Sequence, residues 1–437
     1  MTTGARFIEQ VTARRVWDSR GRPTVEAEVR LGGGVTGRAI APAGASTGSG
    51  EAVDLRDGGA AFGGYDVTGA VRHVEREIGP ALRGHDAADQ AGLDRALAEL
   101  DGTADKSRLG GNALIAVSLA ALHAAAAAAG RPLWRHVLGD RPARLPLPEI
   151  QIFGGGAHAG RRVDVQDFMV VPVGASTFAE SLDWTAEVYR AAGVRMAEAG
   201  RLCGVADEGG YWPAFDTNEE ALECLVRAIE DAGRVPGDEV AIALDVAASE
   251  FGRAGRYRLG LEGRDLDGDG LAELLIGWLD RYPIVSIEDP LGEDDTRGMQ
   301  RFTAAVGDRV QIVGDDYLVT SARRVERAAR DGACNALLVK PNQAGTVTET
   351  RAAFDAARSA GFGTIVSARS GETEDVTIVH LAVGWGAGQL KVGSFSRSER
   401  MAKWNEGLRI ESALGDAAVF AGRAALGGAD PAARSQP

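Results

Sequence analysis

Six short apolar runs in the second half of the chain, each ending at a charged residue, constrain the fold more than any other feature. The runs end, in order, at Asp245, Glu288, Asp315, Lys340, Arg369 and Lys391. Amphipathic stretches such as 322–332 and 346–360 separate most of them, with the apolar spacing of a surface helix. Buried parallel strands that alternate with helices indicate an α/β fold of the (β/α)8-barrel kind. One such charge alone would more often be a solvated loop residue, but six in succession favour a shared active-site mouth at the strand ends.

The first third of the chain has a different pattern. Residues 5–40 alternate apolar and polar side chains, which predicts an antiparallel hairpin, and helical patterns fill 66–138. Three prolines within 141–149 indicate a boundary between two domains. We therefore predict a small N-terminal α+β capping domain at 1–140, a catalytic barrel at 141–426, and a tail at 427–437 that we expect to be disordered.

Composition excludes several classes of function. Acidic residues outnumber basic ones by 62 to 48 over 437 residues, and the net charge of −14 argues against nucleic-acid and anionic-membrane partners. The three scattered cysteines fit neither a disulfide framework nor a zinc site. The first ten residues lack a leader signature, and the longest apolar run, 120–130, is too short to span a bilayer. The sequence thus predicts a cytoplasmic protein.

Lysine is rare in this chain, whereas arginine is common. Of the 48 basic residues only four are lysines, namely Lys106, Lys340, Lys391 and Lys403. A GC-rich genome replaces lysine by arginine wherever either residue works. Positions that keep lysine are therefore enriched for places where an amine must lose its proton, because a guanidinium stays charged.

Three of the strand-end residues, Asp245, Glu288 and Asp315, are carboxylates on consecutive strands. All-oxygen ligation of this kind suits Mg²⁺, with water or substrate oxygens completing the shell. The alternative is structural ion pairing with arginine, but three unpaired acids at one mouth would repel one another. The segment 265–270 begins like a calcium loop, yet Ile276 stands where the bidentate Glu is required, so a polar turn is favoured there.

Several long motifs occur in order along the chain. They include Asp207-Glu208-Gly209-Gly210, the string Arg369-Ser370-Gly371-Glu372-Thr373-Glu374-Asp375, and the segments 18–26, 44–48, 286–290, 314–316, 338–343 and 397–400. In these motifs the sequence resembles the enolase family, and the resemblance covers nearly the whole chain. It implies an enolase-type barrel, Mg²⁺-dependent dehydration of a small anionic phosphorylated carboxylate, and a homodimer or higher homo-oligomer.

The resemblance also implies a role for each matching residue at the metal and at the reacting carbon atoms. Asp245, Glu288 and Asp315 would hold the first Mg²⁺. Lys340 would remove the α-proton, and Glu208 would protonate the departing β-hydroxyl group.

Other matching residues would bind substrate. Lys391 would bind the substrate carboxylate, and Arg369 and Ser370 would hold the phosphoryl group. Ser46, on a mobile loop, would close over the site and ligate a second Mg²⁺ that arrives with substrate. His158 would line the phosphoryl and hydroxyl side, and Asp167 stands at the position of a further catalytic carboxylate of the family.

These residue types suit the chemistry. An α-proton of a carboxylate is weakly acidic, and a Lys base with one or two Mg²⁺ ions is the enolase-superfamily solution that stabilises the dianion. Lys340 must be neutral to act, and we expect neighbouring cations to lower its pKa. The five site carboxylates and three site cations leave a formal charge of −2, which would repel an anionic substrate, and two Mg²⁺ ions change it to +2.

The chain departs from the family pattern mainly at the phosphoryl end. Ala368 stands in Ser367-Ala368-Arg369-Ser370 where the family has histidine, so an active-site imidazole is missing. Asp167 replaces the family's glutamate, which retracts that carboxylate by about 1.5 Å, one carbon–carbon bond. Further differences lie at Ala157 and in the segments 49–50, 211–213 and 393–397.

Two substrates are therefore considered. A pocket enlarged beside Arg369 and Ser370 favours the same elimination on a 2-phosphoglycerate analogue that carries a carboxylate on phosphorus, as in phosphinate-antibiotic pathways. Ordinary dehydration of 2-phosphoglycerate is the second interpretation. A non-catalytic binding protein on an enolase scaffold ranks third, because Lys340, Glu208 and all three metal ligands are present. The 369–375 string disfavours acid-sugar members of the wider superfamily.

Overall fold

A computed structural model describes residues 6–45 and 47–429. The chain begins with a three-stranded antiparallel sheet of β1 (Ile8–Trp17), β2 (Pro23–Leu31) and β3 (Thr36–Ile40). The expected hairpin is thus a sheet with one more strand. The additional turn is made at Asp18, whose Oδ1 accepts hydrogen bonds from the backbone N–H groups of Arg20 and Arg22. Gly21, at φ +69°, supplies the left-handed residue of this turn.

Helices complete the N-terminal domain. They are α1 (Thr68–His73), α2 (Gly79–Leu82), α3 (Gln90–Asp101), α4 (Gly111–Ala128) and α5 (Leu133–Leu138), with short turns η1 (Ala61–Gly64) and η2 (Val74–Ile78). Among the described residues α4 alone is long and apolar enough to cross a membrane, but most of it is buried. It packs on β2 and β3, where a Cβ at Gly37 would lie only 2.1 Å from Ala124 N. We therefore interpret α4 as the core helix of this domain.

Eight strands then close into a barrel. They are β4 (Leu147–Gly154), β5 (Asp167–Val171), β6 (Ala241–Asp245), β10 (Ile284–Glu288), β11 (Gln311–Gly314), β12 (Ala336–Val339), β13 (Gly363–Ser367) and β14 (Gln389–Ser394). The predicted fold class, a small α+β domain followed by an enolase-type barrel, is confirmed. The six strands predicted from the apolar runs all pair in parallel. Strand β5, which the sequence analysis did not identify, runs antiparallel to both β4 and β6.

The direction of β5 follows from its short connection. Only a loop with the turn η3 (Gly156–Ala159) joins β4 to β5, whereas a parallel pair needs a crossover of a dozen or more residues, usually with a helix. Consequently the first residue of β5, Asp167, lies at the mouth and pairs in register with Asp245 of β6.

Helices surround the barrel. They are α6 (Phe178–Glu198), α7 (Asn218–Asp231), α8 (Gly268–Arg281), α9 (Thr296–Val306), α10 (Ala322–Asp331), α11 (Pro341–Ala344), α12 (Val347–Ser359), α13 (Thr377–Trp385) and α14 (Ser398–Leu414), with turns η4 (Ala248–Glu250), η5 (Gly415–Ala417) and η6 (Gly422–Ala429). Of the tail predicted at 427–437, residues 427–429 end η6, and 430–437 lie outside the described residues.

A small sheet follows β6 and contains part of the segment that resembles a calcium loop. It consists of β7 (Gly252–Arg253), β8 (Arg256–Leu259) and β9 (Arg264–Asp267). The segment 265–270 is thus the end of β9 and the start of α8, rather than a simple turn. The Asp267 side chain accepts a hydrogen bond from Gly270 N and caps α8.

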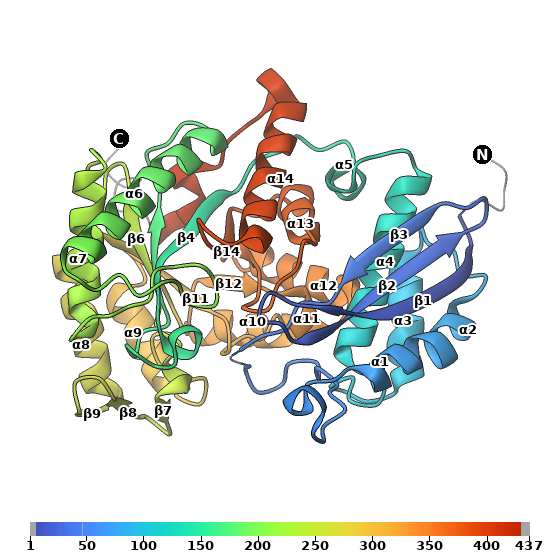
Figure 1. Ribbon diagram of the computed structural model, residues 1–437, viewed down its shortest axis with the longest axis horizontal. Coiled ribbons are helices and arrows are strands. Elements are labelled where there is room, and N and C mark those ends of the chain that lie inside the picture. Colours follow the sequence, from blue (N-terminus) through green and yellow to red (C-terminus); the bar gives the residue numbers. More distant parts are fainter. Residues whose placement is uncertain (1–5, 46, 430–437) are drawn as a thin grey trace.

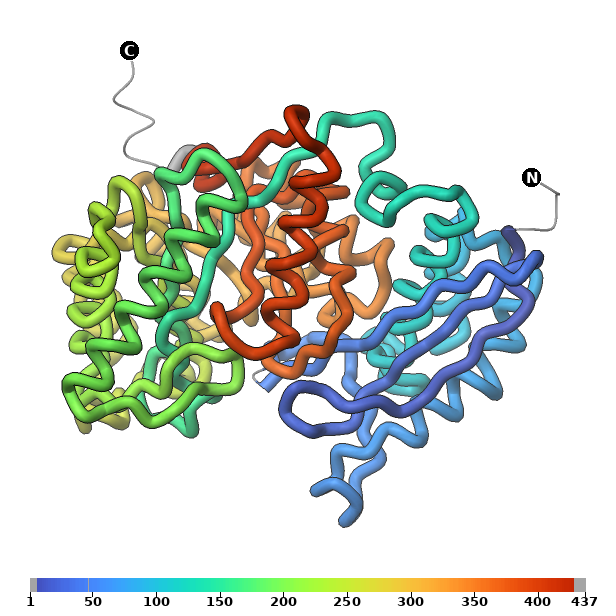
Figure 2. The backbone as a smooth tube through the Cα atoms, turned by 45° about the horizontal axis from the view of Figure 1, so that its top comes forward, coloured from blue at the N-terminus to red at the C-terminus, as the bar shows by residue number. Residues whose placement is uncertain are grey.

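The N-terminal domain lies beside the half of the barrel formed late in the chain. Helix α4 contacts α11, α3 contacts α12, and α5 contacts α13. Figure 1 and Figure 2 show this arrangement from two directions, with the blue and cyan domain next to the orange and red elements. The N-terminal loop after β3 therefore reaches the mouth from the side of β12 and β13.

Candidate active site

The six strand-end charges converge at one end of the barrel. Asp245 and Glu288 end β6 and β10, Asp315 and Lys340 directly follow β11 and β12, Arg369 comes two residues after β13, and Lys391 lies within β14. All six are buried. Four of the six, Asp245, Lys340, Arg369 and Lys391, line a small cavity, whereas Glu288 and Asp315 lie behind its wall. The other lining residues are Ala45, His158, Gln166, Asp167, Glu208, Ser367, Ala368, Ser370, Val392 and Gly393. Most of the predicted site residues thus meet there; Ser46 lies outside the described residues.

The two lysines form ion pairs with the three predicted metal ligands. Lys391 Nζ lies 2.8 Å from both Asp245 Oδ2 and Glu288 Oε2, and 3.4 Å from Asp167 Oδ2. Lys340 Nζ donates a hydrogen bond to Asp315 Oδ2. Each carboxylate that we expected at the metal is therefore held close to an ammonium group.

These ion pairs reverse one expectation. Burial acts to lower the pKa of Lys340, but the carboxylate of Asp315 outweighs it together with Glu288, so the pKa is raised. The neighbouring cations Arg369 and Lys391 do act to lower the pKa of Lys340, as expected, but in the protein without metal the carboxylates outweigh them. In the same way, Asp245, Glu288 and Asp167 hold the pKa of Lys391 well above its usual value despite burial. Lys340 becomes neutral only if another cation competes for Asp315.

The carboxylates fit a divalent cation. Glu288 Oε1 is buried and has no hydrogen-bond partner among the described residues. Burial, together with Asp245 and Asp315, raises the pKa of Glu288 well above its usual value. A buried oxygen without a donor is costly, and a hard cation would satisfy it. The donor set and this free oxygen therefore suit the Mg²⁺ that the sequence predicts.

Two further acids belong to this side of the mouth and had no predicted role. Asp289, Asp315 and Asp316 each bring a carboxylate oxygen within 4.8 Å of the others, close enough to share one ion. Asp289 accepts hydrogen bonds from the N–H groups of Asp315 and Asp316. Burial and the neighbouring Asp315 raise the pKa of Asp316 to about 8. Burial and the crowding of these acids therefore favour a protonated Asp316 in the protein without metal.

Glu208 reaches the mouth from the loop between α6 and α7. Asp207 N donates to His158 O, and Ser394 N donates to Glu208 O, so this loop is tied both to η3 and to the end of β14. His158 Nε2 lies 3.8 Å from both Asp167 Oδ1 and Glu208 Oε1. These three side chains form a compact acid–base group.

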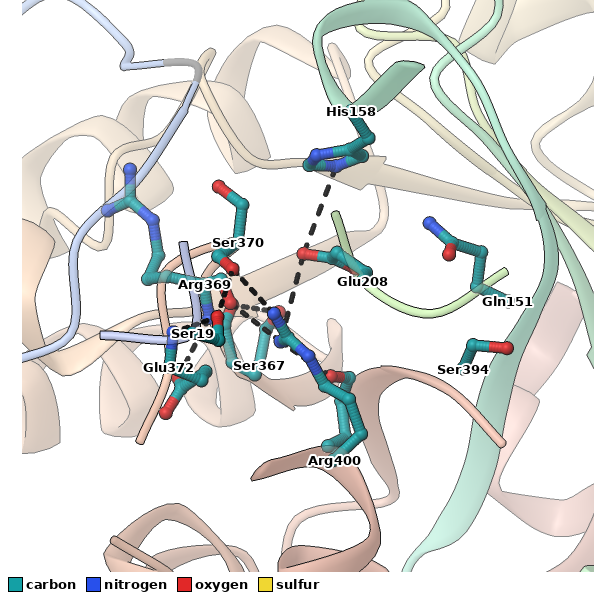
Figure 3. Close-up of polar contacts among 12 residues, drawn as sticks. Ser19, Gln151, His158, Glu208, Ser367, Arg369, Ser370, Glu372, Ser394 and Arg400 are labelled. Atoms are coloured by element: carbon teal, nitrogen blue, oxygen red, sulfur yellow. Dashed lines mark hydrogen bonds and ion pairs between the residues drawn. The ribbon is translucent and has the colours of Figure 1, made fainter. Parts of the chain in front are cut away.

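The two carboxyls of this group differ in ionisation. Burial raises the pKa of Asp167, although Lys391 and His158 oppose the shift. Burial acts in the same direction on Glu208, but His158, Arg400 and the two site lysines outweigh it and lower the pKa of Glu208. This direction favours an ionised Glu208 in the protein without substrate, and Figure 3 shows its contacts with His158 and Arg400.

The phosphoryl end contains a residue that sequence reasoning missed. Arg369 Nη1 lies 3.0 Å from Glu51 Oε2, and both side chains are buried, at 2% and 9% exposure. Asn342 Oδ1 accepts a second hydrogen bond from Arg369 Nη1. Glu51 also accepts a hydrogen bond from Gln343, whose Nε2 in turn donates to Asp315. The only sequence signal for Glu51 is its place five residues after Ser46.

Ala368 lies at the wall of the cavity beside Arg369 and Ser370. Its backbone N–H donates to the carbonyl oxygen of Lys391, so residue 368 is fixed between β13 and β14. A methyl group thus stands where the resemblance expects an imidazole, and the enlarged pocket predicted beside it stays a prediction. Asp167 is held back by Gln151, whose Nε2 donates to its Oδ1.

Both domains match known family models. Residues 142–427 match the model described as enolase, C-terminal TIM barrel domain. Residues 8–137 match the model described as enolase, N-terminal domain. The match thus covers the sheet domain, the barrel and every residue of the cavity.

Proposed function

Since the chain belongs to the enolase family, we propose that it is a Mg²⁺-dependent dehydratase that eliminates water from a small phosphorylated or phosphonylated 3-hydroxy acid. The observation that carries this proposal is the convergence of Lys340, Glu208 and Lys391 on one buried cavity. Base, acid and carboxylate-binding cation are thereby within reach of one small substrate. The free oxygen of Glu288 adds support for the metal.

In the first step Lys340 removes the α-proton. The amine must first lose its own proton, which requires that Asp315 no longer pairs with it. Asp245, Glu288 and Asp315 would hold Mg²⁺, and in a loaded site Ser46 would hold a second ion. When bound, Mg²⁺ supplies positive charge that stabilises the dianion formed by proton removal. Lys391 binds the substrate carboxylate beside these groups.

In the second step Glu208 protonates the departing hydroxyl group. Glu208 is ionised without substrate, but an anionic substrate placed against it raises its pKa, so that the carboxyl can carry a proton. Arg369 and Ser370 hold the phosphoryl group, and Glu51 must release Arg369 for that contact to form. His158 and Asp167 complete the wall on the hydroxyl side.

Metal dependence tests the reaction class. Purified protein treated with EDTA is expected to form no enolpyruvate product from either 2-phosphoglycerate or its carboxyphosphono analogue, and added Mg²⁺ is expected to restore product formation. Full turnover in a metal-free preparation would contradict the proposal. So would a protein that binds these acids with Mg²⁺ yet exchanges no α-proton, which would favour a binding protein on this scaffold.

Within this class we propose the analogue with a carboxylate on phosphorus as the preferred substrate. The chain would then be similar in activity to carboxyphosphonoenolpyruvate synthase of phosphinate-antibiotic pathways. Support comes from Ala368 at the cavity wall and from Asp167, whose shorter side chain is held back by Gln151. The missing imidazole at Ala368 would leave room beside Arg369, and the shorter side chain of Asp167 would reduce repulsion for an added carboxylate. Ordinary 2-phosphoglycerate is the second candidate, because every residue assigned to the reaction itself is present.

A binding measurement separates the two substrates at their phosphorus end. Phosphonoformate carries a carboxylate on phosphorus, whereas inorganic phosphate does not. In the presence of Mg²⁺, phosphonoformate is expected to bind the protein more tightly than phosphate, measured by calorimetry. Equal affinity for the two ligands would favour ordinary 2-phosphoglycerate.

A further inference from the structure

Arg400, in the first turn of α14, is a fully buried guanidinium that has no role in the steps above. Its relative exposure is 0%, although the chain has many exposed arginines. Burying a charged group is expensive unless hydrogen bonds and opposite charges compensate for it, and such groups are weak devices for stability. The partners of Arg400 therefore indicate what it does.

Most of those partners are backbone groups of two strand ends, and the neighbouring carboxylate of Glu399 lies 3.5 Å from Arg400 Nε. Arg400 Nη1 donates to Arg369 O at 2.7 Å and to Val392 O at 2.9 Å, and Nη2 donates to Ser370 O at 2.6 Å. Arg369 and Ser370 are the proposed phosphoryl contacts, and Val392 adjoins Lys391. The planar guanidinium of Arg400 thus joins two parts of the site. It fixes the proposed phosphoryl-binding segment 369–370 to strand β14, which carries Lys391.

The same guanidinium touches the proposed acid. Arg400 Nη1 lies 3.9 Å from Glu208 Oε1, and Figure 3 shows the side chain of Arg400 between Glu208 and the segment 369–370. Glycine at 393 makes this approach possible. With φ at +106°, a Cβ there would lie 3.1 Å from both Arg400 Cδ and Glu208 Cβ. The fold therefore keeps a side chain out of the space between the two residues.

We propose that Arg400 is a positioning residue that aligns Glu208 with the phosphoryl-binding segment 369–370, so that protonation of the leaving hydroxyl depends on a correctly held substrate. This inference rests on the proposed function. It assigns Arg400 to the second step, because the described contacts of its side chain reach Glu208 but not Lys340. The first step, removal of the α-proton, should be nearly independent of Arg400.

The test compares two rates in the same variant, namely exchange of the α-proton with solvent deuterium and formation of product. In Arg400→Gln, product formation is expected to fall by about 10²-fold, the usual contribution of a positioned acid, while exchange changes little. Arg400→Lys keeps the positive charge but lacks the planar guanidinium that donates several hydrogen bonds at once. Product formation should therefore fall less than in Arg400→Gln, and KM should rise because segment 369–370 is held less firmly. The lysine variant also covers the case in which the glutamine variant does not fold.

Lys403→Gln is the matched control. Lys403 is a second fully buried cation of α14 and contacts the same string, 2.9 Å from Thr373 O and 3.0 Å from Glu372 Oε2, but no contact joins it to Glu208 among the described residues. It should lose thermal stability without changing the ratio of the two rates. An unchanged ratio of the two rates in the Arg400 variants, whether both rates fall equally or neither falls, would overturn the inference. Absence of both reactions in the wild-type protein would instead contradict the proposed function.

Discussion

The two sides of the barrel mouth differ in how far they follow the enolase pattern. The acid side consists of Asp245, Glu288, Asp289, Asp315 and Asp316 at the ends of β6, β10 and β11. The phosphoryl side consists of Ala368, Arg369 and Ser370 after β13, with Glu51 and Arg400 behind them. The acid side keeps every ligand that the resemblance implies, whereas the phosphoryl side has lost an imidazole at position 368.

This difference separates reaction from substrate. Groups that move protons and hold cations act on the carboxylate end of any such substrate, so they cannot change without loss of the reaction. Groups around phosphorus meet the part of the substrate that can vary. We therefore infer that the acid side determines the reaction class and that the phosphoryl side determines which substrate is accepted.

Loss of the base should have the largest effect. Lys340→Ala is expected to reduce both α-proton exchange and product formation by about 10²–10⁴-fold, because one amine removes the proton. Glu208→Gln should lose product formation but keep exchange, since the acid acts afterwards. Both rates can be followed by NMR in deuterated buffer. Normal exchange in Lys340→Ala would show that another group is the base.

Loss of a metal ligand should come next. Asp315→Ala is expected to raise the Mg²⁺ concentration needed for half-maximal activity by more than about tenfold, because a ligand oxygen is lost. Asp245→Ala should behave in the same way, and saturating Mg²⁺ should recover part of the activity. A Mg²⁺ titration measures this shift. An unchanged Mg²⁺ requirement in both variants would contradict the assignment of these acid-side residues as metal ligands.

Refilling the space on the phosphoryl side should have a moderate effect. Ala368→His is expected to lower kcat/KM on the carboxyphosphono analogue by about 10–200-fold, the range that a single change in pocket shape can supply. The α-proton chemistry should survive. Steady-state kinetics on the analogue check this, with Ala368→Ser as the small control. Equal activity of the histidine variant would mean that residue 368 does not meet the substrate.

The smallest effect concerns stability and pH on the acid side. Asp316 has a pKa of about 8 in the folded protein, well above the ordinary value of about 3.9 expected when unfolded. The folded state thus binds the extra proton, and stability without metal should fall as pH rises from 5 to 8. Asp316→Asn should weaken this dependence and raise Tm at pH 8 by roughly 1–3 °C relative to the wild-type protein. Scanning calorimetry in EDTA at both pH values tests the sign, and a wild-type Tm that is higher at pH 8 than at pH 5 would contradict it.

Much of the site could be predicted from sequence because each continuous apolar run, typical of a strand buried on both faces, ends where a charged residue begins. Asp245, Glu288, Asp315 and Lys340 follow apolar runs directly, so their meeting at one mouth follows from barrel geometry. Asp167 precedes its apolar run, and only the short β4–β5 connection reveals that it faces the same mouth.

Other features depend on contacts that no local pattern encodes. Glu51 and Arg369 are 318 residues apart, and their ion pair forms only when the loop after β3 meets the end of β13. The burial of Arg400 could not be predicted either. The chain has 44 arginines, and nothing in the sequence around a buried arginine distinguishes it from an exposed one. The raised pKa of Lys340 depends on its distance from Asp315, which spacing along the chain does not give.

Side-by-side measurement of kcat/KM for the purified wild-type protein with Mg²⁺ on both substrates distinguishes an enolase-type reaction on a changed substrate from ordinary dehydration of 2-phosphoglycerate. We predict that kcat/KM for the carboxyphosphono analogue exceeds that for 2-phosphoglycerate by at least about tenfold. Brisk turnover of 2-phosphoglycerate with no turnover of the analogue would contradict it.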